Sequence, residues 1–141
     1  MKPTLFLRIA SILVLIFCAG HTTGTFSPPA PGVQTMVVQT MKANSFNAMG
    51  SMRTFWDFLF GYGVMFSVTL LGHCILFWML SSLIKVDGAR LRPILLLLCI
   101  EFIVTGVIAG RYFFIGPLIG SLHVALCLAI AALTARSGAA A

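Results

Sequence analysis

Four long apolar runs constrain what this chain can fold into more than any other feature of its sequence. They cover residues 4–24, 55–83, 93–111 and 114–135. A helix needs about 20 apolar residues to cross a bilayer, whereas membrane β-barrels show alternating segments of about ten residues. Hydrophobic residues make up 60% of the chain and charged residues 9%, against about a quarter in soluble proteins. The sequence therefore predicts an all-α fold, a four-transmembrane-helix up-down bundle that forms a single membrane domain over residues 1–141.

The positive charges predict how the runs are oriented. They lie singly at the ends of apolar runs, which is typical of membrane anchors and not of a nucleic-acid surface. With alternating runs, one side of the membrane receives six of them and the other side three: Lys2, Arg8, Lys85, Arg90, Arg92 and Arg136 against Lys42, Arg53 and Arg111. The positive-inside rule then predicts that both termini lie in the cytoplasm.

The first run has a second interpretation, a cleaved signal peptide. Lys2 and Arg8 form a basic start, and residues 18–20 are small enough for a cleavage site. We favour a membrane span, closed by the polar residues 21–23. The cysteines also favour membrane-embedded runs, because all four lie within apolar segments and none has C-x-x-C spacing: Cys18, Cys74, Cys99 and Cys127. We expect four free, buried thiols.

The segment 25–54 is predicted to be an external loop. Its proline-rich start, residues 27–32, cannot form a regular helix, because proline lacks the amide donor and favours extended backbone. Apolar residues then recur near helical spacing over residues 33–42, which predicts a short amphipathic helix. Such a helix either lies on the outer membrane surface or packs as an ordinary loop helix.

Glycines predict how the last two runs pack. Gly106 and Gly110 form G-x-x-x-G at the end of the third run, and Gly116 and Gly120 form another at the start of the fourth. Small residues let two helix backbones approach closely in lipid. We therefore expect the third and fourth runs to form a tight hairpin. The spacing of small and polar residues on the fourth run also predicts that His123 points inward.

Ionisable residues within the runs are the candidate functional residues, because charge at membrane depth is costly. Glu101 has no basic neighbour in its own run, and His73 and His123 lie at comparable depth on other runs. We expect a hydrogen bond between Glu101 and one of these histidines. Such a bond would form either a proton-transfer or substrate-polarising pair, or a structural link between helices. The same two histidines would be needed to hold a haem b. We expect no cofactor and no metal site.

A second polar group is predicted at the external ends of the first three runs. It contains His21, Arg53, Asp57 and Arg111. An arginine-to-aspartate pair there could fasten helix ends together. Interfacial anchoring and helix capping are the alternative, because Asp57 falls in the first turn of its run, where a negative charge suits the helix dipole.

Two short segments carry a family resemblance. Residues 7–10 with Gly20, His21 and Thr22, and residues 49–58 leading into Gly61 and Gly63, resemble a family of small bacterial four-helix membrane proteins of unassigned activity. The resemblance covers the chain through the second run. It implies a multi-pass protein of the bacterial inner membrane and, for a site, points to His21, Arg53 and Asp57.

The sequence leaves several functions open. A non-catalytic accessory or assembly protein fits best, with other membrane subunits or further copies of the chain as partners within the lipid bilayer. A membrane-embedded enzyme acting on a lipid-like substrate through Glu101, with His73 or His123, is the first alternative. A small proton-coupled transporter is the next, followed by a redox protein that binds a cofactor.

Overall fold

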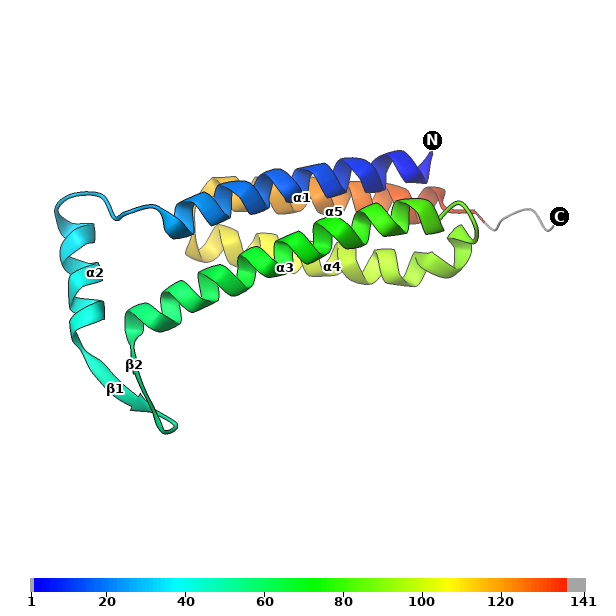
Figure 1. Ribbon diagram of the computed structural model, residues 1–141. Helices are drawn as coiled ribbons and strands as arrows, with labels where there is room; N and C mark the ends of the chain where they lie inside the picture. The colour runs from blue at the N-terminus through cyan, green and yellow to red at the C-terminus, as the bar shows by residue number, and fades with distance from the viewer. Residues whose placement is uncertain (1, 137–141) are drawn as a thin grey trace. The chain divides into compact units, whose positions relative to one another are not determined.

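The protein is mainly helical in the computed structural model, which describes residues 2–136 (Figure 1). Within these residues the elements are α1 (Pro3–Phe26), α2 (Val33–Ala43), β1 (Ser45–Ala48), β2 (Ser51–Thr54), α3 (Phe55–Leu83), α4 (Gly88–Tyr112) and α5 (Ile115–Thr134). Four of the helices, α1, α3, α4 and α5, are long and apolar enough to cross a membrane. The predicted helical class and the four candidate spans are confirmed.

The chain divides into two compact units. The first contains Met1–Phe17 and Leu70–Ala141, and the second contains Cys18–Thr69. Both α1 and α3 contribute to both units. The first unit thus combines the start of α1 and the end of α3 with α4 and α5, and the second combines the end of α1 and the start of α3 with the segment between them.

Apolar side chains from all four helices form the core of the first unit. The fully buried ones include Leu7 and Val14 of α1, Phe77 of α3, Leu95 of α4 and Leu128 of α5. The other buried residues of each helix recur at helical spacing, so each helix presents one apolar stripe to this core. The opposite faces keep large apolar side chains exposed, as helices that meet lipid do.

Of the two glycine motifs, only the first lies at the contact between α4 and α5. A Cβ at Gly106 would lie 3.4 Å from Ser121 Cβ, and one at Gly110 would lie 3.2 Å from Leu118 Cδ2, so α4 approaches α5 closely there. Gly116 instead faces the ring of Phe114, and a Cβ at Gly120 would meet nothing within 4 Å. The prediction that both motifs form packing faces is therefore wrong for the second one, because the side chains Leu118 and Ser121 make the contact on α5.

The helix α4 begins earlier than the apolar run predicts. Its first residue is Gly88, before Pro93. The Asp87 carboxylate caps this start by accepting a hydrogen bond from Arg90 N, at 3.4 Å, and pairs with the Arg90 side chain at 3.0 Å. Capping thus sets the helix start, while Pro93 is accommodated inside the helix.

The segment between α1 and α3 holds a β-hairpin that the sequence did not predict. β1 and β2 pair antiparallel, with Ser45 opposite Thr54. The turn residues Met49 and Gly50 both have positive φ, 52° and 91°, as tight two-residue hairpin turns require. Asn47 Oδ1 accepts a hydrogen bond from Gly50 N at 2.7 Å and supports the turn.

The short helix predicted before this hairpin is confirmed as α2. None of its residues is buried. On its polar side the Lys42 ammonium lies 4.6 Å from the centre of the Trp56 ring, in the first turn of α3. A cation over an aromatic face is attracted by the ring quadrupole, so this contact fixes α2 to the start of α3.

Candidate functional site

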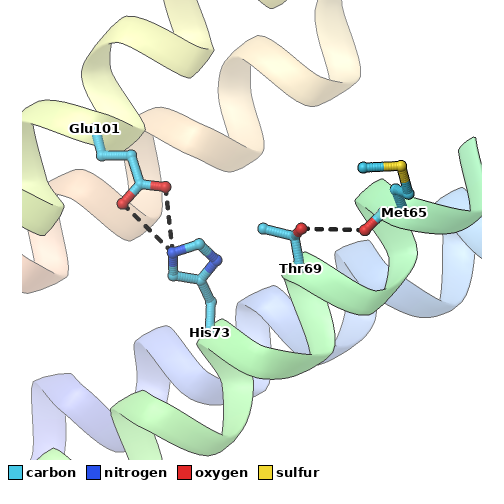
Figure 2. Close-up of polar contacts among 4 residues, drawn as sticks. All are labelled: Met65, Thr69, His73 and Glu101. Atoms are coloured by element: carbon cyan, nitrogen blue, oxygen red, sulfur yellow. Dashed lines mark hydrogen bonds and ion pairs between the residues drawn. The ribbon is translucent and has the colours of Figure 1, made fainter. Parts of the chain in front are cut away.

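Glu101 and His73 make a direct polar contact between two helices of the first unit (Figure 2). His73 comes from α3 and Glu101 from the middle of α4. The imidazole Nε2 lies 3.2 Å from Oε1 and 3.4 Å from Oε2 of the carboxylate. Of the two histidines that the sequence offered to Glu101, the structure therefore brings His73 to it.

Aromatic rings hold His73 in this orientation. Phe102 meets the imidazole edge-on, with ring centres 5.4 Å apart, and Phe77 lies at 5.9 Å. The two phenyl rings contact each other and are buried. Because they confine the imidazole, only 14% of the His73 side chain is exposed, whereas 47% of the Glu101 side chain is exposed.

The chemistry of this pair follows from its two proton positions. With the proton on the imidazole, a cation faces a carboxylate; with the proton on the carboxyl group, two neutral groups face each other. Both arrangements have zero net charge, which lowers the cost of placing them among apolar side chains. The contact can therefore link α3 to α4, or exchange a proton along the line from Nε2 to the carboxylate.

His123 takes a different position from the one that the sequence predicts. It is exposed on α5, and its Nδ1 lies 2.7 Å from Ile119 O in the preceding turn. Because a carbonyl oxygen only accepts, Nδ1 carries the proton of this bond. The inward-facing prediction is wrong because the buried stripe of α5 passes through Val124 and Leu128 instead. The haem alternative, which needs His73 and His123 together, stays a prediction.

The polar residues predicted near the external ends have separate partners. His21 Nε2 donates to Gly63 O at 3.0 Å, and the ring meets Phe66 edge-on. The Arg53 guanidinium donates to Met52 O at 3.0 Å. Asp57 caps its own helix, as described below, while Arg111 belongs to the other unit, where it is exposed in the last turn of α4.

Asp57 and Thr54 cap the start of α3 reciprocally. The Asp57 carboxylate accepts from Thr54 N at 2.7 Å, and Thr54 Oγ1 accepts from Asp57 N at 3.1 Å. This is a capping box, in which each side chain satisfies a backbone donor that the first helical turn leaves unpaired. The spacing T-x-x-D was visible in the sequence and accounts for Asp57 without a catalytic role.

We expect Asp57→Ala to loosen the first turn of α3. The change removes the acceptor for Thr54 N, so amide hydrogen exchange in that turn should accelerate, while exchange in the middle of α3 should stay the same. Asp57→Asn keeps an acceptor and should exchange at nearly the native rate. Equal exchange in Asp57→Ala and the native chain, measured by mass spectrometry, would argue against the cap.

Small polar side chains that the sequence reasoning overlooked join α1 to α3 in the second unit. Thr22 Oγ1 donates to Ser67 Oγ at 2.9 Å, and Cys18 Sγ donates to Ser67 O at 3.4 Å. Gly63 O accepts from both His21 and Ser67. The signal was the spacing of four residues between Cys18 and Thr22, and between Gly63 and Ser67, which places each pair on one helical face.

A further polar contact of the first unit joins the start of α4 to the end of α5. The Arg92 guanidinium donates through Nε to Ala135 O, at 2.9 Å, and also through Nη2. A cation at a helix C-terminus satisfies a carbonyl that lacks an intrahelical partner and favours the negative end of the helix dipole. Arg92 is therefore a helix cap, a role beyond the membrane anchoring that the sequence predicts.

Comparison with known proteins leaves the site to be judged on its own geometry. No family model, no curated protein and no solved structure matches the chain. Within residues 2–136, no group of three or more His, Cys, Asp or Glu side chains gathers as a metal site would require. The four cysteines are free thiols, as predicted, but the prediction that all are buried is wrong for Cys74, which is only partly buried. The Glu101–His73 contact, between two of the four helices that are long and apolar enough to cross a membrane, is thus the candidate functional site.

Proposed function

We propose that the chain is a non-catalytic accessory or assembly subunit, and that another membrane protein binds it over the Glu101–His73 pair. The observation that carries this proposal is the exposure of Glu101. Its side chain is 47% exposed, although it lies in the middle of a helix that is apolar enough to cross a membrane.

The surroundings of Glu101 define what can cover it. On the same face of α4, Leu97 and Ile108 are exposed, so the carboxylate lies among side chains that suit lipid or a partner helix. Hydrocarbon offers no hydrogen-bond donors, and an ionisable group facing it is costly. A hydroxyl, amide or basic side chain of a neighbouring membrane helix would add a second donor beside His73 on the exposed side of the carboxylate, which supports a partner protein at this position.

The proposed setting is the bacterial inner membrane, with the four long helices as an up-down bundle and both termini in the cytoplasm. The distribution of Lys and Arg supports the orientation, and the resemblance to small bacterial four-helix proteins supports the location. In this orientation His21, Arg53 and Asp57 lie toward the external side.

The test is native purification in a mild detergent, with particle mass and co-purifying chains read by mass spectrometry. We expect unrelated chains at fixed stoichiometry, and at least a several-fold loss of them in Glu101→Leu. Val107→Ala is the matched control, because Val107 is exposed on another face of the same helix. A native chain that purifies alone or as a homo-oligomer, without any co-purifying chain, would contradict the proposal.

The Glu101–His73 contact itself favours a second candidate function, proton exchange in a membrane enzyme or a proton-coupled transporter. A carboxylate and an imidazole in hydrogen-bond reach, with one side open, is an arrangement that general acid–base chemistry uses. The same purification separates the two candidates. If the chain purifies alone, a deletion strain decides the question. Proton exchange would be favoured if the Glu101→Gln variant fails to restore the native phenotype to that strain while the Val107→Ala variant restores it.

A further inference from the structure

An open apolar groove runs between α1 and α3 in the first unit. Its walls are Ile12 and Leu15 of α1 and Ile75 and Met79 of α3, all of which keep about half or more of their side chains exposed. Its floor is polar but satisfied, because the buried Ser11 hydroxyl donates to Cys74 O at 2.8 Å. The groove therefore presents hydrocarbon to whatever lies in it and no unmet hydrogen bond.

A cation lies beside Trp78, which lines one end of this groove. α1 and α3 run in opposite directions here, since Ser11 lies against Cys74 and Arg8, one turn earlier, lies against Trp78. The Arg8 guanidinium carbon is 5.2 Å from the centre of the Trp78 ring. The arginine side chain is exposed, so its N–H groups can turn from the ring toward a ligand at the end of the groove.

The charges near this end are mostly positive. Lys2 precedes α1 and Lys85 follows α3, and both side chains are exposed. The carboxylate that follows α3, Asp87, is paired with Arg90 at 3.0 Å. An anionic ligand is therefore favoured over a neutral or cationic one.

A cation at one end and apolar walls beyond it match the headgroup and acyl chain of a phospholipid. Tryptophan and arginine are common at the level of lipid headgroups, and a guanidinium binds phosphate through two parallel hydrogen bonds. Apolar walls continue from that point along the helices, where an acyl chain would extend. We propose that Arg8 and the α1–α3 groove bind one anionic phospholipid, with its phosphate on Arg8 and an acyl chain in the groove. This site is independent of the proposed partner at Glu101.

The test uses the full chain in nanodiscs of phosphatidylglycerol and phosphatidylcholine in equal parts, released into the gas phase for native mass spectrometry. We expect the native chain to retain one phosphatidylglycerol, and Arg8→Gln to retain it about fivefold less, as the loss of one cation near a headgroup implies. Arg111→Gln removes an exposed positive charge in the last turn of α4, at the other end of that helix from Asp87, and should retain the lipid like the native chain.

A second variant tests the groove separately from the charge. Ile12→Trp fills the groove without changing charge and should also lower retention of phosphatidylglycerol, and it carries the test if Arg8→Gln does not fold. Equal retention of the two lipids by the native chain would overturn the proposal. So would native retention in Ile12→Trp, which would leave only attraction at the surface, or a loss in Arg111→Gln as large as in Arg8→Gln.

Discussion

His73→Leu is expected to lower the free energy of unfolding of the purified chain by about 3 kcal/mol, the scale for a charged group left without a polar partner. The reason is that Glu101 then loses Nε2, which lies 3.2 Å from its carboxylate, among apolar neighbours. Unfolding by SDS in dodecylmaltoside micelles, followed by tryptophan fluorescence, measures the effect.

The Glu101–His73 pair allows a controlled comparison. Glu101→Gln still offers an amide to the imidazole, so it should cost less than about 1 kcal/mol, the scale of a single hydrogen bond between membrane helices. His73→Leu combined with Glu101→Leu replaces both partners by apolar groups and should recover most of the stability lost in His73→Leu. If His73→Leu proved as mild as Glu101→Gln, the contact would contribute little to the fold.

Gly88→Ala is expected to destabilise the first unit by about 2 kcal/mol, the typical cost of overpacking. A Cβ at Gly88 would lie 2.8 Å from Arg136 O and 3.2 Å from Arg136 N. These are backbone atoms, so relief requires a shift of the segment that follows α5, which would also weaken the Arg92 bond to Ala135 O. The same micellar unfolding experiment measures the change.

Gly72→Ala is the matched control for this prediction. A Cβ at Gly72 would meet nothing within 4 Å, so only the helix propensity changes. Alanine is better than glycine in a helix by roughly 0.5–1 kcal/mol, and this variant should be as stable as the native chain or more stable. Two variants of the same chemical change should thus move stability in opposite directions. Equal effects would mean that Gly88 is not confined.

The apolar runs predicted the long helices well, because a bilayer-length hydrophobic segment has few other ways to satisfy its backbone. The helix starts were harder to predict. α4 begins at Gly88 and not at Pro93, because the Asp87 cap extends the helix toward its N-terminus. The β1–β2 hairpin was missed because its turn depends on a positive φ at Met49, and methionine seldom adopts a positive φ.

The sequence predicted which residues belong to the candidate site, but only part of how they are arranged. The cost of charge in an apolar run singled out Glu101 and the two histidines from residue type alone. Which histidine meets Glu101 depends on the rotation of α3 and α5 about their axes. The phenyl rings of Phe77 and Phe102 fix the orientation of the His73 imidazole. His123 differs because the buried stripe of α5 excludes it.

The sequence by itself determined the helical class, the four long apolar helices and the residues with unusual polarity, because these follow from local composition and period. Only the tertiary structure decided which polar groups meet: Glu101 with His73, Arg92 with Ala135 O, and Arg8 with Trp78. These contacts join residues far apart in the chain. Their existence depends on how the helices rotate to bury their core stripes, and helical periodicity alone does not specify that rotation.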